Sequence, residues 1–185
     1  WHPDPGRGGQ AAVLHQGIGE EEVEVTIRIA ILTISDAGSR GERVDTSGDA
    51  IAGWAAVRGY DVVARTIIPD EMDAIAEQFI VWIDDFGPEL ILTTGGTGLS
   101  PRDVTPEATD AILERRAPGI PELLRVSALA KNPRAALSRG VAGVREGVLI
   151  INLPGSTSAV REGLAALEPI IEHAVDLASG RRTAH

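Results

Sequence analysis

The sequence predicts an α/β fold, a three-layer sandwich in which helices cover both faces of a mainly parallel β-sheet. Short runs rich in Ile, Val and Leu alternate along the chain with segments whose apolar residues recur at helical spacing. The runs are apolar at consecutive positions, which is typical of parallel strands buried on both faces. Aromatic residues are only 3% of the chain, so the core must be built from aliphatic side chains.

The pattern begins with a β-branched, mostly apolar run at 27–34, which predicts a buried strand. The polar, glycine-containing segment 35–41 predicts a loop. Thr46 and Ser47 are favoured N-cap residues for a helix that ends at Gly59, a typical C-terminal glycine.

A second strand is expected at 61–68, where Pro69 ends it. The segment 73–86 predicts an amphipathic helix, because its large apolar residues fall on one stripe. Gly87 and Pro88 end that helix.

The third predicted strand, 90–94, is short and leads into a Gly-Gly-Thr-Gly turn at 95–98. Thr105 and Pro106 are typical of an N-cap followed by the first helical position. A further helical pattern covers 121–131.

The fourth predicted strand, 148–153, ends in a Pro-Gly-Ser turn, and the last helix runs through Val160 and Leu177 with a kink expected at Pro169. Strands separated by helices imply right-handed crossovers. Because ligands of such sheets bind at the carboxyl ends of the strands, we expect the site among the turns that follow them.

The domain itself is expected at 26–180, with a flexible N-terminal tail at 1–25 and a short C-terminal tail at 181–185. The N-terminal segment is rich in Pro, Gly and acidic residues and has no sustained periodicity. The chain begins with Trp rather than Met, as it would if part of this tail came from a tag.

Composition excludes several classes of function. The chain has 17 Lys and Arg against 27 Asp and Glu, a net charge of −10, so we expect no nucleic-acid or membrane partner. Cysteine is absent, which excludes disulfides, thiolate metal sites and cysteine nucleophiles and suits a cytoplasmic protein. The four histidines have no metal-ligand spacing. Any phosphate must therefore be bound by backbone N–H groups, a few arginines and a cation.

The turn at 95–98 is a weak signal by itself. Its glycines allow close approach of a ligand and direct N–H groups at an anion, but a tight turn explains them equally well.

The residues that follow the turn include side chains that can bind phosphate and a metal ion. Arg102 can form a bidentate fork with phosphate, and Asp103 can hold Mg²⁺ together with phosphate oxygens. The alternative interpretation of Arg102 and Asp103 is a surface ion pair beside a helix cap. Thr105 is better explained as a helix cap than as a catalytic residue.

Other polar residues follow or precede the predicted strands without being decisive singly. Asp70 and Asp36 lie just after strands, but local sequence alone favours an ordinary turn aspartate for Asp70, and Asp36 has the same ambiguity. Candidates near the fourth strand are Ser138, Arg139, Asn152 and Ser156.

The run at 94–109, Thr-Gly-Gly-Thr-Gly-Leu-Ser-Pro-Arg-Asp-Val-Thr-Pro-Glu-Ala-Thr, closely resembles the central motif of the molybdopterin adenylyltransferase family, the Mog/MoaB type of molybdenum-cofactor biosynthesis protein. Matches in the family's order continue the resemblance at 32–36, 68–71, 137–143 and 151–156. The resemblance covers most of the chain, from about 26 to 180.

The resemblance implies transfer of AMP from Mg·ATP to the terminal phosphate of molybdopterin, with release of pyrophosphate. Mg²⁺ would be the cofactor and ATP the co-substrate, in a cytoplasmic homotrimer that could hand its product to a molybdate-insertion protein. The family's functional aspartates map onto Asp70 and Asp103, with Asp103 as metal ligand. Residues expected to bind substrate or nucleotide are Ser35, Asp36, Gly95, Gly96, Thr97, Gly98, Ser100, Arg102, Glu107, Ser138, Arg139, Asn152, Pro154, Gly155 and Ser156.

Two other functions stay open at this point. The chain could be a non-catalytic molybdopterin-binding or carrier protein of the MoaB type, or a domain of the competence-damage type that acts on nucleotide pyrophosphates.

One residue departs from the family's pattern: Thr157 stands where many relatives have a second proline, which leaves the turn before it less constrained.

Overall fold

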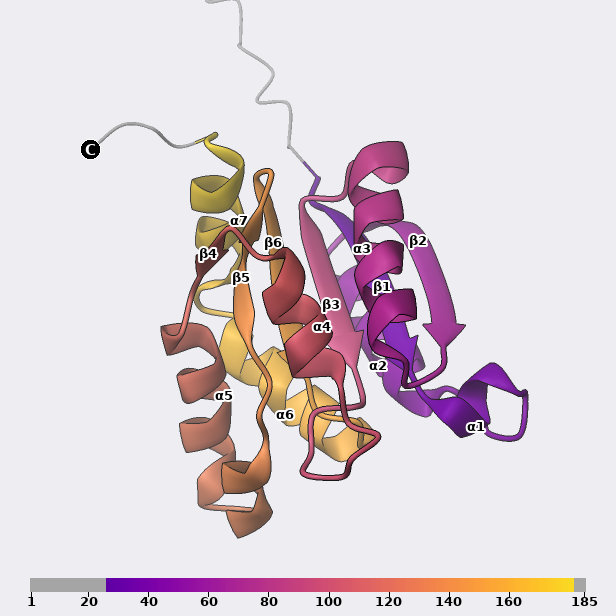
Figure 1. Ribbon diagram of the computed structural model, residues 1–185. Coiled ribbons are helices and arrows are strands. Elements are labelled where there is room, and N and C mark those ends of the chain that lie inside the picture. Colours follow the sequence, from indigo (N-terminus) through magenta and orange to yellow (C-terminus); the bar gives the residue numbers. More distant parts are fainter. Residues whose placement is uncertain (1–25, 182–185) are drawn as a thin grey trace, which may run out of the picture.

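The computed structural model describes residues 26–181, which form a six-stranded sheet between two layers of helices (Figure 1). The strands are β1 (Arg28–Ile34), β2 (Asp61–Ile68), β3 (Leu90–Thr94), β4 (Arg115–Arg116), β5 (Ala142–Arg145) and β6 (Val148–Leu153). The helices are α1 (Asp36–Ser39), α2 (Thr46–Val57), α3 (Met72–Phe86), α4 (Thr105–Ile112), α5 (Gly119–Leu129), the 3₁₀ helix η1 (Pro133–Leu137), α6 (Thr157–Leu167) and α7 (Ile171–Ser179).

The sheet has the order β2-β1-β3-β6-β5-β4, and its first four members are parallel. The prediction of a mainly parallel sheet built from four apolar strands is therefore confirmed. Its parallel strands end at the same edge, where α1 and the segment between β3 and α4 lie (Figure 1).

Strands β4 and β5 are antiparallel and were not predicted. The two residues of β4 are exposed arginines, which carry no apolar signal. β5 has four residues and turns back into β6 through Glu146 and Gly147, whose φ values of 47° and 78° are both positive. A two-residue turn with this backbone matches the twist of an antiparallel hairpin.

Two aliphatic cores lie on opposite faces of the sheet. One face packs against α2, α6 and α7, with Ile51, Val160 and Val175 buried against it. The other face packs against α3 and α4, where Phe79 is fully buried. The alternation of strand side chains between these cores explains why β1, β3 and β6 are buried at almost every position.

Several predicted boundaries are wrong. Residues 35–41, expected as a loop, include the short helix α1. The N-cap of α2 is Asp45 rather than Thr46 or Ser47: its carboxylate accepts the Gly48 N–H at 2.9 Å.

Further along the chain, the residue before α4 is Val104, because the Thr105 side chain bonds back to the preceding loop instead. Helix α5 begins two residues earlier than expected. The single kinked C-terminal helix is two helices, α6 and α7, separated around Pro169.

The predicted tails lie mostly outside the described residues. Arg181, expected in the C-terminal tail, forms ion pairs with Glu89 and Asp176 and so belongs to the folded body. Within 26–181, no helix has both the length and the apolar character needed to cross a bilayer.

Candidate active site

The turns after β1, β3 and β6 touch one another. Gly95 has φ of 98°, and a Cβ atom there would lie 2.2 Å from the Ile34 carbonyl oxygen, so only glycine fits. A Cβ on Gly155 would lie 3.2 Å from the Gly95 Cα. The Thr94 hydroxyl donates to the Pro154 carbonyl at 2.7 Å and links the turns after β3 and β6.

The segment 95–104, called here the glycine-rich loop, leaves β3 and returns to α4. Thr105 closes it: its N–H donates to the Gly96 carbonyl at 3.1 Å and its hydroxyl donates to the Gly95 carbonyl at 3.0 Å. Gly96 has φ of 64°, and a Cβ there would lie 2.3 Å from the Thr105 Oγ1 and 3.0 Å from the Asp70 Oδ1. The absence of a side chain at Gly96 therefore lets the Asp70 carboxylate approach the loop.

Asp70 is held by Asp36 in a reciprocal arrangement. The Asp36 N–H donates to Asp70 Oδ2 at 3.0 Å, and the Asp70 N–H donates to Asp36 Oδ1 at 3.0 Å. Within the described chain, Asp70 Oδ1 has no hydrogen-bond partner. Burial raises the pKa of Asp70, and the nearby charges of Asp36 and Asp103 raise it further, against the opposing effects of the Asp36 N–H and of Arg102.

Asp103 is anchored in the same way. Its Oδ2 accepts the Ser100 N–H at 2.9 Å and would lie 2.8 Å from a Cβ on Gly98. Its Oδ1 has no hydrogen-bond partner among residues 26–181. Asp70 and Asp103 thus each present one fixed and one free carboxylate oxygen.

Two cavities meet at the glycine-rich loop. The first, called the α2 cavity, has about 380 Å³ and is lined by Thr33, Ile34, Ser35, Gly38, Arg43, Val44, Asp45, Thr46, Ser47, Asp70, Thr94, Gly95, Gly96, Asp103, Gly155 and Ser156. The second, called the α5 cavity, has about 370 Å³ and lies between that loop, α5, η1 and α6. The two share Gly96, Asp103, Gly155 and Ser156.

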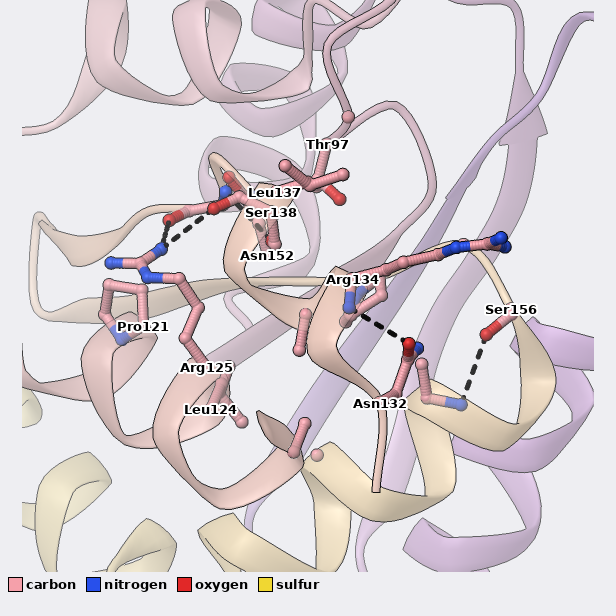
Figure 2. Close-up of a pocket in the computed structure, with 18 of the residues that line it drawn as sticks. Thr97, Pro121, Leu124, Arg125, Asn132, Arg134, Leu137, Ser138, Asn152 and Ser156 are labelled. Atoms are coloured by element: carbon pink, nitrogen blue, oxygen red, sulfur yellow. Dashed lines mark hydrogen bonds between the residues drawn. The ribbon is translucent and has the colours of Figure 1, made fainter. Parts of the chain in front are cut away.

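The α5 cavity is lined by both apolar and polar side chains (Figure 2). Pro121, Leu124 and Leu137 contribute apolar surface. Arg125 lies beside Ser138 and donates to the Ser138 and Gly140 carbonyls at 3.2 and 3.3 Å. A cavity that joins apolar surface with polar groups able to orient a ligand is typical of a small-molecule site.

Most of the predicted site residues line one or both cavities. They are Ser35, Asp70, Gly95, Gly96, Thr97, Gly98, Asp103, Ser138, Asn152, Pro154, Gly155 and Ser156. Two of the hydroxyl residues also cap helices: Ser35 accepts the Gly38 N–H in α1, and Ser156 accepts the Ala159 N–H in α6. Asn152 is buried, and both N–H groups of its amide bond the hydroxyls of Thr93 and Thr109, which leaves them unavailable to a ligand.

Asp36, Ser100, Arg102, Glu107 and Arg139 line neither cavity. The expected phosphate fork of Arg102 is occupied by a protein carboxylate: its Nε and Nη2 donate to the Asp36 oxygens at 2.8 to 3.1 Å. This pair lowers the pKa of Asp36, with help from the Asp70 N–H. Arg102 therefore pairs with Asp36. The sequence alone also allowed Asp103 as its partner.

Arg139 and Glu107 pair with each other, and Arg139 also bonds the glycine-rich loop. The pairing with Arg139 lowers the pKa of Glu107. Both charges are therefore engaged within the protein, outside the two cavities.

Sequence reasoning missed three arginines that line the cavities. Arg43 lines the α2 cavity, and Arg125 and Arg134 line the α5 cavity. Within the described residues the guanidinium groups of Arg43 and Arg134 make no hydrogen bond or ion pair. No signal in the sequence distinguishes them, because each lies in a segment that is mostly polar or exposed.

The donor set at the junction of the cavities fits a divalent cation that a ligand also coordinates. The free oxygens of Asp70 and Asp103 are hard donors of the type that Mg²⁺ prefers. Residues 26–181 contain no group of three acidic or histidine side chains that could hold a metal ion. Mg²⁺ commonly binds through one or two carboxylates and the phosphates of a substrate, so the chemistry of this donor set is compatible with Mg²⁺.

Comparison with known proteins identifies the relatives of this chain. The family described as "Probable molybdopterin binding domain" matches residues 30–173. Over 157 residues the chain is 41% identical to the molybdopterin adenylyltransferase of Helicobacter pylori, covering 84% of this chain and 89% of that protein. The Escherichia coli molybdopterin adenylyltransferase is 38% identical over 146 residues, which cover 77% of this chain and 74% of that protein. The molybdopterin biosynthesis enzyme MoaB from Thermus thermophilus superposes with a TM-score of 0.79 at 51% identity, covering 84% of this chain and 98% of that chain.

Proposed function

The chain belongs to the family of molybdopterin binding domains, and we propose that it transfers AMP from ATP to molybdopterin. The relatives named molybdopterin adenylyltransferase, at 38–41% identity over most of the chain, support this activity. The observation that carries the proposal is the meeting of two cavities at Gly96 and Asp103, because an adenylyl transfer must bring two anionic substrates together at one point.

In the proposed reaction, an oxygen of the molybdopterin phosphate forms a bond to the α-phosphorus of ATP, and the bond to pyrophosphate breaks. The pterin ring occupies the α5 cavity, where Leu124 and Leu137 offer apolar walls and Ser138 a hydroxyl. The polyphosphate occupies the α2 cavity, which offers the hydroxyls of Thr46 and Ser47 and the guanidinium of Arg43. No strong base is needed, because the attacking phosphate is already ionised.

The contribution of the protein is to hold charges and reactants in place. Asp70 and Asp103 both line the α2 cavity, and a main-chain N–H holds one carboxylate oxygen of each. Mg²⁺ bound there would offset the negative charge of the phosphates and of the leaving pyrophosphate. Glycine at 95, 96 and 98 lets the loop pack closely against Ile34, Thr105 and Asp103, where a Cβ atom would collide.

The direct test is pyrophosphate release from purified protein, molybdopterin and Mg·ATP. We expect release with the wild type and at least a ~100-fold slower rate with Asp103→Asn, since one positioned charge is worth about two orders of magnitude in comparable sites. Asp84→Asn on the exposed side of α3 is the control and should leave the rate unchanged. Full activity of Asp103→Asn would contradict the assigned role.

The placement of the two substrates has its own test. Replacing Arg43 with Gln should raise the KM for ATP and leave the KM for molybdopterin unchanged, because Arg43 lines the α2 cavity alone. An increase confined to the KM for molybdopterin would show that the assignment of the cavities is reversed.

A second candidate function is binding or carriage of molybdopterin without catalysis. The family match supports it, because the family's description names binding of molybdopterin and no reaction. Calorimetry separates the two: a carrier binds molybdopterin and releases no pyrophosphate when Mg·ATP is added.

Assembly as a homotrimer and handover of the product to a molybdate-insertion protein are part of the proposal and follow from the family resemblance. Light scattering of the purified protein tests the trimer. A cytoplasmic location stays a prediction.

A further inference from the structure

Arg139 lies between η1 and β5 and directs its hydrogen-bonding groups at the glycine-rich loop. Its Nε donates to the Gly98 carbonyl at 2.7 Å, and its Nη2 donates to the Asp103 carbonyl at 2.6 Å. Its Nη1 pairs with Glu107 in α4, and its main-chain N–H donates to the Thr97 carbonyl at 2.8 Å. One side chain therefore holds the main chain at both Gly98 and Asp103.

The segment between those two carbonyls has few other anchors. Ser100 and Asp103 bond each other, which stabilises the turn without attaching it to the rest of the protein. Leu99 is 66% exposed. The other side-chain attachment of the segment to a distant element is the pair of Arg102 with Asp36.

We propose that Arg139 is a positioning residue, whose guanidinium sets the orientation of the Asp103 carboxylate by fixing the two ends of the segment 98–103. The inference rests on the proposed function for its catalytic consequence, but not for its effect on the loop. Arg139 lines neither cavity, so it acts through Asp103 and not on a ligand.

The planar guanidinium is needed for this task. Its nitrogens lie in a fixed fork and reach two carbonyls and a carboxylate at once, whereas a lysine ammonium is a single point that cannot span them. Lysine retains the charge that balances Glu107. Arg139→Lys therefore removes the geometry of the clamp and keeps its electrostatics.

The test compares Arg139→Lys with Arg115→Lys. Arg115 is an exposed arginine of β4 whose side chain makes no hydrogen bond or ion pair within the described residues. Pyrophosphate release should show kcat lowered at least ~10-fold, with KM for either substrate changed less than about threefold, since a displacement of about 1 Å can cost roughly 10²-fold. Hydrogen–deuterium exchange should be faster in the peptide covering 95–105, while other peptides and the urea midpoint stay near the wild type. Arg115→Lys should change none of these.

Each result decides between alternatives. Wild-type kcat and wild-type exchange in Arg139→Lys would overturn the inference, and so would a rise in KM as large as the fall in kcat, which would mean that Arg139 binds substrate. If the wild-type protein releases no pyrophosphate but exchange at 95–105 still rises in Arg139→Lys, the clamp stands and the proposed function fails. If Arg139→Lys does not fold, the double variant Arg139→Gln/Glu107→Gln replaces it, because it removes the guanidinium fork and leaves no unpaired charge. Faster exchange at 95–105 in this variant supports the clamp, and unchanged exchange overturns it.

Discussion

Replacing Gly96 with Ala tests the close approach of Asp70 to the glycine-rich loop. At φ of 64° an alanine pays roughly 1–2 kcal/mol for the left-handed backbone. Its Cβ would also lie 2.3 Å from the Thr105 Oγ1, which is buried and bonded to the Gly95 carbonyl. Losing that bond costs about 1–3 kcal/mol. We therefore expect the free energy of unfolding, measured by urea denaturation, to fall by about 2–5 kcal/mol.

The matched control is Gly53→Ala on the exposed side of α2, where a Cβ would meet nothing within 4 Å. That change should raise the free energy of unfolding by about 0.5–1 kcal/mol, because alanine is the better helix former. If Gly96→Ala is as stable as the wild type, the loop cannot have the backbone described above, and the contact between Gly96 and Asp70 loses its support.

Three further changes probe the network around the site and the core. Arg102→Gln removes a charge that lowers the pKa of Asp70, so the acidic limb of the kcat/KM profile should move to higher pH. In the proposed reaction, activity requires ionised Asp70 and is lost as the pH falls through its pKa. An unmoved limb would assign the titration to another group. Asn152→Leu leaves two threonine hydroxyls without their partner amide and should lower the urea-derived free energy of unfolding by about 2–4 kcal/mol. Phe79→Ala should lower the same quantity by about 3–5 kcal/mol, the usual cost of removing a buried phenyl ring, and a loss below about 1 kcal/mol would mean that the core under α3 is loosely packed.

The parallel part of the sheet could be predicted because its strands have a physical signature. Ile29, Ile31 and Leu32 are completely buried, as a strand covered on both faces requires. β4 and β5 carry no such signature, since β4 is two exposed arginines and β5 contains a glycine at Gly143. Their pairing depends on contacts between distant residues and on the turn at 146–147, which a periodicity pattern does not contain.

The position of the site was predictable for a similar reason. Parallel strands bring their carboxyl ends together, so Asp70 and Asp103 line one cavity although 33 residues separate them along the chain. Their roles in catalysis stay predictions until the variants are measured.

The partners of the arginines could not be predicted. Phosphate, carboxylate and main-chain carbonyl oxygens all accept from a guanidinium, and the sequence does not show which of them lies nearest. Arg102 and Arg139, expected at the ligand, bond a carboxylate and two carbonyls of the protein. Arg43 and Arg134, given no role by the sequence, line the cavities instead.

This difference between the two groups of arginines has a physical consequence for the proposed site, which must hold several negative charges. Arginines that bind the loop remain in place when the ligand leaves, so the carboxylates of Asp70 and Asp103 keep their orientation between turnovers. The cost of ordering the loop is then met during folding and not at each binding event, which is the advantage of a preorganised polar site. In the proposed reaction, an arginine without partners among residues 26–181, such as Arg43, would be available to follow the polyphosphate as its shape changes. The two kinds of arginine should therefore affect different kinetic constants. Loss of Arg139 should lower kcat, and loss of Arg43 should raise the KM for ATP.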